Sequence, residues 1–213
     1  MNANAKLLEL FLAKHFPQFE CPQCEFTFLT KVYLPDSPTA AEQLSLLAQA
    51  LLPAAPADSR YVILEKHALG LEYFMDAIRR FPVHHAPHVH RVAVLSEAGE
   101  VLDESMIQLS SDAEPDYRII YLMERLEHLN AQDVAFFNEH IHELDWQNEG
   151  ERHQCLTWLG EFYGASLESD VRLLCRYFRE RQQFIKWDLH GENLMRRPGT
   201  GELVILDPYT LNY

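Results

Sequence analysis

Three oxygen-bearing side chains near the carboxyl end of the sequence have a spacing that suits metal chemistry. Asp188 and Asn193 lie five residues apart in a polar stretch, and Asp207 follows Asn193 by fourteen residues at the end of an apolar run. The intervening Pro-Gly-Thr-Gly at 198–201 predicts a hairpin that folds Asp207 back beside Asn193. Carboxylate and amide oxygens are hard ligands for Mg²⁺, and a second carboxylate can take the proton of an attacking hydroxyl. This pattern indicates phosphoryl transfer, with Asp188 as base and Asn193 and Asp207 as metal ligands.

The stretch also resembles the catalytic and metal-binding loops of the protein-kinase-like superfamily. The residues that carry the resemblance are the Asp-Leu-His that begins at Asp188, Asn193 after it, and the apolar strand that ends in Asp-Pro at Asp207. This form is similar to minimal kinases of the phage or bacterial-effector type. The resemblance implies ATP and Mg²⁺ as cofactors. It also implies an α+β, two-lobed fold, truncated after the hairpin that carries Asp207.

His190 stands two residues after Asp188, where protein kinases carry a lysine that contacts phosphate. The resemblance implies that His190 donates a hydrogen bond to a phosphate oxygen and belongs to the catalytic set. The alternative is a hydrogen bond that only stabilises the loop. The sequence leaves both open.

Upstream, the resemblance extends back to about residue 61. Strands are predicted at 61–67, 87–95 and 117–126, with a helix at 69–81 and a strand at 101–109 that pairs back after the turn at 98–99. By the resemblance, Lys66 contacts the nucleotide phosphates and pairs with Glu72, or alternatively with Asp76. The alternative for Lys66 itself is a surface lysine at a strand end. The hinge would hold adenine through the main chain at Glu124 and Leu126.

One departure from the kinase pattern concerns glycine. A glycine-rich loop normally precedes the lysine and covers the phosphates, but the first glycine of this sequence is Gly70. The departure keeps two further hypotheses open beside a minimal protein kinase. One is a pseudokinase-like binding protein that acts through a partner, and the other is a small-molecule kinase.

The domain organisation that we expect has three parts. Residues 1–57 form an extension with helices at 5–16 and 39–52 and a strand at 25–34, and 58–126 form the first lobe and hinge. Residues 127–213 form a truncated, mainly helical second lobe, with helices starting at 130–133 and spanning 153–162 and 167–184. The helix at 167–184 lacks its usual kinase cover, so we expect the amino-terminal helices to bury part of its apolar side.

The net charge of the chain limits the classes of binding partner that we expect. The net charge of −14 argues against nucleic acid and anionic membrane surfaces and favours a basic protein partner. A protein substrate or activating protein is expected, with a homodimer as a further possibility. No apolar run has membrane-spanning length and no secretory signal is evident, so a cytoplasmic location is expected, in the host cell if the source is a phage or an effector.

Cysteines and histidines offer weaker signals. Cys21 and Cys24 form a lone C-x-x-C, which is expected to be a reduced surface turn instead of a zinc or redox site. Cys155 and Cys175 are expected to be buried thiols. Four histidines gather at His84, His85, His88 and His90. They indicate a solvated loop or a pH-sensitive surface or, as the alternative, a metal site.

Overall fold

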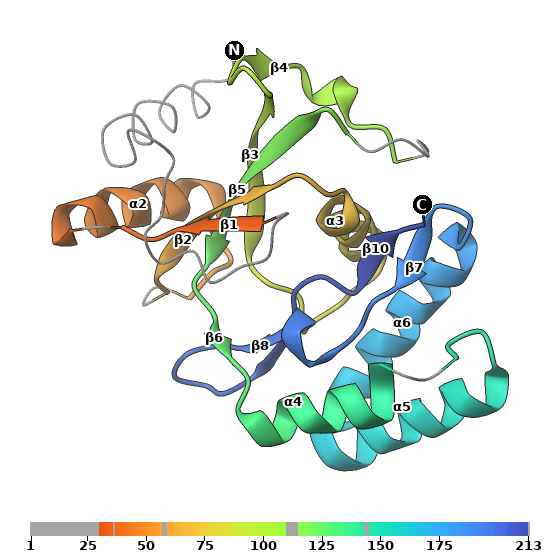
Figure 1. Ribbon diagram of the computed structural model, residues 1–213. Coiled ribbons are helices and arrows are strands. Elements are labelled where there is room, and N and C mark those ends of the chain that lie inside the picture. Colours follow the sequence, from red (N-terminus) through yellow and green to blue (C-terminus); the bar gives the residue numbers. More distant parts are fainter. Residues whose placement is uncertain (1–29, 36, 57–58, 110–114, 143–144, 213) are drawn as a thin grey trace. The chain divides into compact units, whose positions relative to one another are not determined.

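The computed structural model describes residues 30–35, 37–56, 59–109, 115–142 and 145–212 of the 213-residue chain. The described residues form two compact units (Figure 1). Unit 1 contains the described residues up to Ala68, then His88–Gln108 and the described residues that end at Arg125. Unit 2 contains Leu69–Pro87, Leu109 and the described residues from Leu126 onward.

Unit 1 is an antiparallel sheet with the strand order β1-β2-β5-β3-β4 and one long helix. The elements are β1 (Thr30–Tyr33), α2 (Pro38–Leu51), β2 (Tyr61–Lys66), β3 (Val89–Ser96), β4 (Val101–Leu102), the 3₁₀ helix η1 (Glu104–Met106) and β5 (Tyr117–Glu124). The predicted strands at 61–67, 87–95 and 117–126 are therefore confirmed. The strand predicted at 101–109 stops at Leu102, because the Asp103 side chain accepts a hydrogen bond from Ser105 N and begins η1.

Helix α2 begins as its sequence predicts. The Ser37 side chain accepts a hydrogen bond from Ala40 N at 3.2 Å, and Pro38 occupies the first turn, where its missing N–H costs nothing. Leu44 and Ala48 of α2 are buried in one cluster with Ile63 of the sheet. The helix predicted at 39–52 is confirmed, and its apolar side covers the sheet of unit 1.

Residues at the end of β2 point alternately to the two faces of the sheet. The Glu65 side chain accepts a hydrogen bond from the Tyr33 hydroxyl at 2.8 Å and pairs with Arg118 at 3.2 Å. Tyr33 belongs to the core that contains α2. Since successive strand residues face opposite sides, Lys66 points to the sheet face that α2 does not cover.

Unit 2 contains four α-helices, a two-stranded ribbon and a three-stranded sheet among its described residues. The helices are α3 (Gly70–Arg80), α4 (Ala131–Phe137), the π-helix η2 (Asn138–His142), α5 (Glu149–Tyr163), α6 (Ala165–Arg181) and the 3₁₀ helix η3 (Gly191–Asn193). The ribbon pairs β7 (Ile185–Trp187) with β10 (Tyr209–Leu211), and the sheet has the order β6 (Glu127–His128), β8 (Leu194–Arg196), β9 (Leu203–Ile205).

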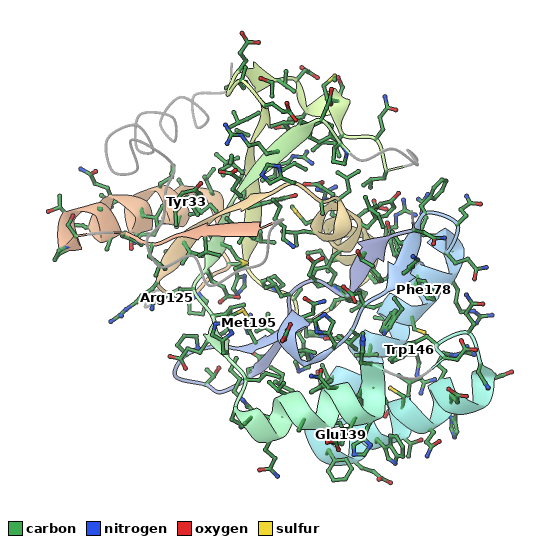
Figure 2. All side chains as sticks on the ribbon, in the orientation of Figure 1. Tyr33, Arg125, Glu139, Trp146, Phe178 and Met195 are labelled. Atoms are coloured by element: carbon green, nitrogen blue, oxygen red, sulfur yellow. The ribbon has the colours of Figure 1, made fainter. Side chains whose placement is uncertain are left out.

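The apolar side of α6 is buried within unit 2. Its residues Leu174 and Phe178 are buried, α5 packs beside α6, and the Tyr209 hydroxyl of β10 donates to Leu174 O at 2.8 Å. Phe178, which is labelled in Figure 2, also contacts the Trp187 ring of β7. Helix α2, one of the two helices expected to cover this side, buries its own apolar side against the sheet of unit 1. The other helix proposed for that role, at 5–16, lies outside the described residues.

Helix α5 starts earlier than predicted. Asn148 caps it, since its side-chain oxygen accepts hydrogen bonds from Gly150 N at 3.0 Å and Glu151 N at 3.4 Å. Cys155 and Cys175 are buried and form no disulfide, as predicted, and burial raises the pKa of Cys175 to about 11. Cys21, Cys24 and the part of the predicted strand before Thr30 lie outside the described residues.

The described chain is thus an α+β structure with antiparallel sheets. In the described ranges, no helix combines the length and the apolar character that crossing a lipid bilayer requires.

Candidate functional site

The hairpin that carries Asn193 and Asp207 forms as predicted. Strands β8 and β9 pair in antiparallel register, with Leu194 opposite Ile205. The pairing continues one step further, because Leu206 N donates to Asn193 O at 2.9 Å. Asp207 therefore follows directly on the residue that is bonded to Asn193.

The Asn193 side chain is tied to Asp188. Its Nδ2 donates to the main-chain oxygen of Asp188 at 2.8 Å and to the Asp188 carboxylate at 3.2 Å. Its Oδ1 accepts no hydrogen bond from any residue in the described ranges. The amide is therefore fixed through its nitrogen, and its oxygen is left available to a ligand.

Asp188 sits at the end of β7 in a partly buried position. Its N–H donates to Pro208 O at 2.9 Å, so the main chain after Asp207 also holds the loop. Burial raises the pKa of the Asp188 carboxyl above its ordinary value, and the charge of Asp207 raises it further. The charges of His190 and His142 and the hydrogen bond from Asn193 lower the pKa, but less strongly. The two carboxylates are therefore electrostatic neighbours.

His190 stabilises the loop that contains it. Its Nδ1 accepts a hydrogen bond from Glu192 N at 3.2 Å, and its Nε2 lies 2.9 Å from Nδ2 of Asn193. Its ring is 3.8 Å from the Asp188 carboxylate. The structure thus shows the loop-stabilising arrangement, and a role toward phosphate stays a prediction.

Asp207 lies against the first turn of α3. A β-carbon added at Gly70, the first residue of α3, would come within 2.8 Å of Oδ1 of Asp207 and would overlap the main-chain oxygen of Tyr209. Only glycine allows the helix to approach this segment so closely. The sequence showed Gly70 merely as the first glycine, and gave no sign of this contact.

A π-helix supports the loop at 188–193 from its other side. The Asn138 side-chain oxygen of η2 accepts a hydrogen bond from Gly191 N at 2.8 Å. At the end of η2, the His142 ring lies 5.2 Å from the His190 ring in an edge arrangement. A β-carbon on Gly191 would come within 2.8 Å of the Val134 Cα, so α4 also approaches the loop closely. Sequence reasoning missed Asn138, His142 and Gly191, because single polar residues in a helix carry no signal of a distant partner.

The proposed phosphate-binding residues fall in different units. Lys66 is in unit 1 and is only 6% exposed, which does not fit the alternative of a surface lysine. Glu72 is on α3 in unit 2 and is also buried. Asp76, the alternative partner, is bound within unit 2 by the Tyr177 hydroxyl at 2.7 Å and by Arg80 at 2.8 Å.

The predicted hinge coincides with the passage from one unit to the other. Glu124 ends β5, its N–H donates to His88 O, and its side chain accepts from His88 N at 2.8 Å. The Glu124 amide is therefore used within the sheet of unit 1. Leu126, the first residue after the passage into unit 2, is buried.

The histidine-rich segment is divided between the units. His84 and His85 bind the buried Asp170 of α6, whose Oδ2 accepts from both main-chain N–H groups at 2.8 and 2.7 Å and lies 2.7 Å from His85 Nδ1. Burial opposes the ionisation of Asp170, but its bonds to His85 and His84 outweigh burial and hold the pKa below 3.8. His88 and His90 belong to unit 1. These four residues therefore do not form one solvated loop, since His85 is part of a buried cluster.

Within the described part of the chain, no group of three or more His, Cys, Asp or Glu side chains converges to hold a metal ion. Asn193 and Asp207 supply one amide and one carboxylate, which is fewer donors than such a group of three would contain. No protein-family model matches the sequence, and no curated protein matches it significantly.

Proposed function

We propose that this chain is an ATP- and Mg²⁺-dependent phosphotransferase of the protein-kinase-like type, with a hydroxyl group as phosphoryl acceptor. One observation supports it above all. The Asn193 amide is anchored through its nitrogen on Asp188 at 2.8 and 3.2 Å, while the hairpin places Asp207 directly beyond it. This fixes a base, an amide oxygen and a carboxylate within one short segment of unit 2. The location that we propose remains the cytoplasm.

The residues present fit Mg²⁺. The ion takes few protein ligands and keeps coordination positions for water and phosphate oxygens. Oδ1 of Asn193 and the Asp207 carboxylate would hold it, and both are hard oxygen donors. When bound, the ion would neutralise charge on the transferred phosphoryl group.

Asp188 fits the role of base. Burial and Asp207 raise its pKa toward the working range of a general base. Its main chain is held by Pro208 O and its carboxylate by Asn193, so the carboxylate is oriented before any substrate arrives. The acceptor hydroxyl would give its proton to this carboxylate. Replacement of Asp188 by alanine should lower phosphoryl transfer by about 10² to 10⁴, the usual contribution of a positioned base.

Calorimetric titration tests the proposal directly. A non-hydrolysable ATP analogue should bind in Mg²⁺ and lose affinity in EDTA, and Asp207→Asn should weaken the Mg²⁺-dependent binding by at least about tenfold. Glu161→Gln, which changes an exposed carboxylate on α5, is the matched control and should bind like the parent protein. Equal affinity in Mg²⁺ and EDTA, for the parent and for Asp207→Asn, would refute the metal assignment.

A binding protein of kinase-like descent is the second candidate function. The sequence has no glycine before Gly70, so the loop that usually covers nucleotide phosphates is lacking from that region. The net charge of −14 would favour a basic protein partner. Nucleotide binding without transfer to any protein or small hydroxyl acceptor would favour this candidate over the phosphotransferase.

A further inference from the structure

One helical segment of unit 2, made of α4 and the π-helix η2 that follows it, contacts the chain on both sides of Asn193. Before Asn193, the Asn138 side-chain oxygen of η2 accepts a hydrogen bond from Gly191 N at 2.8 Å. After Asn193, the Asp133 carboxylate of α4 accepts a hydrogen bond from the guanidinium of Arg196 and pairs with its charge. The proposed metal ligand therefore lies between two contacts to the same helical segment.

Asp133 is a buried carboxylate that accepts hydrogen bonds from side chains of three different parts of unit 2. Its Oδ2 accepts from the Asn130 amide, which caps α4, at 2.8 Å, and its Oδ1 accepts from the Tyr163 hydroxyl of α5 at 3.0 Å. Arg196 of β8 is the third donor, and its guanidinium also donates to Gly201 O in the turn before β9. Hydrogen bonds between charged groups are stronger than neutral ones. This cluster therefore fixes the hairpin of β8 and β9 to α4 and α5.

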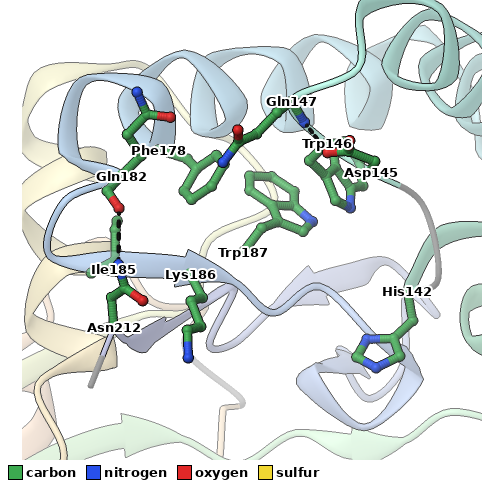
Figure 3. Close-up of a pocket in the computed structure, with 10 residues that line it drawn as sticks. All are labelled: His142, Asp145, Trp146, Gln147, Phe178, Gln182, Ile185, Lys186, Trp187 and Asn212. Carbon is green, nitrogen blue, oxygen red and sulfur yellow. Dashed lines mark hydrogen bonds between the residues drawn. The ribbon is translucent and has the colours of Figure 1, made fainter.

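The π-helix η2 brings two residues to the loop that precedes Asn193. Asn138, its first residue, accepts the hydrogen bond from Gly191 N. His142, its last residue, lies with its ring 5.2 Å from the ring of His190. In the close-up of Figure 3, the His142 side chain extends from η2 toward the blue loop that follows β7. The loop is therefore in contact with η2 at two neighbouring residues.

Asn193 is the last residue of the 3₁₀ helix η3, inside the piece of chain that these contacts enclose. The piece from Gly191 to Arg196 is bonded to η2 at one end and to α4 at the other, so it cannot shift unless one of these bonds breaks. A ligand of Mg²⁺ must be placed accurately, because this ion demands nearly ideal octahedral geometry. Misplacement by about 1 Å, caused by a change away from the reacting atoms, can lower a rate about 10²-fold. The two contacts therefore bear on metal binding as well as on stability.

We propose that Asp133 and Asn138 are positioning residues, which fix the Asn193 side chain for Mg²⁺ without contacting the ion. This assignment rests on the proposed function. Asp133 acts through Arg196, which follows Asn193 on β8, and Asn138 acts through Gly191, which precedes it. Because each of them fixes one end of the same piece of chain, loss of either should let Asn193 move.

Calorimetric titration of a non-hydrolysable ATP analogue in Mg²⁺ tests both residues. Asn138→Ala removes the acceptor of the Gly191 N–H, so affinity should fall roughly fivefold, the usual value of one hydrogen bond. Asn138→Asp keeps an acceptor oxygen at the same position and should retain at least the parental affinity. Asp133→Asn and Arg196→Met each remove the ion pair, and each should weaken binding about tenfold. If the two residues act through one bridge, the double variant should bind no more weakly than either single variant.

Two control variants separate positioning from a general loss of stability or charge. Val171→Ala leaves a cavity at a fully buried position of α6, so it should lower the free energy of unfolding and still bind the nucleotide like the parent protein. Glu168→Gln removes an ion pair with Arg172 at 2.7 Å on α6 and should also bind normally. All variants are compared at a temperature where urea denaturation shows them to be folded. An equal loss of affinity in Val171→Ala and Asn138→Ala would overturn the assignment.

The NMR signals of the Asn193 side-chain NH₂ report its position without nucleotide or metal. They should shift or broaden in Asp133→Asn and Asn138→Ala, and should stay at their parental positions in Val171→Ala and Asn138→Asp. This measurement contains no ligand, so a parent protein that fails to bind the nucleotide in Mg²⁺ refutes the phosphotransferase and not the structural link. Unchanged Asn193 signals, or unchanged affinity in both Asp133→Asn and Asn138→Ala while the parent binds, would overturn the positioning role.

Discussion

Nδ2 of Asn193 lies 2.8 Å from the main-chain oxygen of Asp188 and 3.2 Å from its carboxylate. One amide group thus connects two residues that the sequence separates by five positions, and it fixes both at the end of β7. In the proposed site, Asn193 must donate hydrogen bonds to Asp188 and also offer an oxygen to the metal ion. A side-chain amide can do both, because its nitrogen is a donor and its oxygen is an acceptor.

Asn193→Asp should disrupt this link with little change in volume. A carboxylate cannot donate, so both hydrogen bonds to Asp188 are lost, and a second negative charge stands beside the base. Phosphoryl transfer should fall by at least about tenfold, since charge-assisted hydrogen bonds contribute about 1.5 to 3 kcal/mol. Steady-state kinetics with labelled ATP would measure the loss. Gln183→Glu adds the same charge at an exposed position, and a similar loss there would contradict the explanation.

His142→Gln should change the pH dependence of transfer. The charge of His142 lowers the pKa of Asp188, so its removal lets that pKa rise. In the proposed mechanism Asp188 acts as a base only when it is ionised, so activity should fall as the pH decreases through its pKa. The acidic limb of the kcat/KM profile should therefore move to higher pH in the variant.

A carboxyl NMR titration gives an independent check on His142, since the Asp188 resonance should titrate at a higher pH in His142→Gln than in the parent. His153→Gln alters an exposed histidine of α5 and serves as the control, with an unchanged profile. A shift toward lower pH in His142→Gln would contradict the electrostatic role.

Local patterns predicted much of the structure. Helix α2 was predictable because Ser37-Pro38 and Pro53 mark its ends, and the hairpin was predictable because its turn residues lie between two short apolar strands. Strand β10 was not predicted, since three residues become a strand only by pairing with β7. Hydrogen bonds between residues far apart in the sequence were not predicted either. Asp76 bonds to Tyr177, 101 residues away, and Gly191 bonds to Asn138, 53 residues away. The elements were thus predictable from local patterns, whereas the contacts between distant residues were not.

Asp170→Asn should destabilise unit 2. The buried carboxylate accepts from the main-chain N–H groups of His84 and His85 and lies 2.7 Å from His85 Nδ1. A neutral amide weakens this cluster and places a donor in it, so the free energy of unfolding should fall by about 1 to 3 kcal/mol at neutral pH. Urea denaturation would measure the change, with Glu180→Gln on the same helix as the exposed control.

The effect of Asp170→Asn should depend on pH with a defined sign. The folded-state pKa of Asp170 lies below 3.8, so its ionised form stabilises the fold above that pH. This stabilisation is lost as the pH falls through the lowered pKa. The difference between parent and variant should therefore be largest near neutral pH and should shrink in strong acid. A difference that grows as the pH falls would contradict this role for the carboxylate.

Gly191→Ala should displace the loop at 188–193. A β-carbon at this position would come within 2.8 Å of the Val134 Cα and 2.9 Å of the Val134 main-chain oxygen. Main-chain atoms of a helix cannot move aside as a flexible side chain can, so the loop itself must shift. The shift would weaken the hydrogen bond from Gly191 N to Asn138 and should lower the free energy of unfolding by about 1 to 3 kcal/mol, as overpacking does.

Two further variants identify the cause of that loss. Gly150→Ala places a β-carbon 3.4 Å from its nearest neighbour in the first turn of α5, so it should leave stability unchanged or raise it by up to about 1 kcal/mol. Val134→Ala combined with Gly191→Ala should not restore stability, because the overlap is chiefly with the main chain of Val134. Urea denaturation would measure the stability of that double variant. Recovery of parental stability would show that the overlap is with the Val134 side chain, and that the close approach of the α4 main chain does not require glycine at position 191.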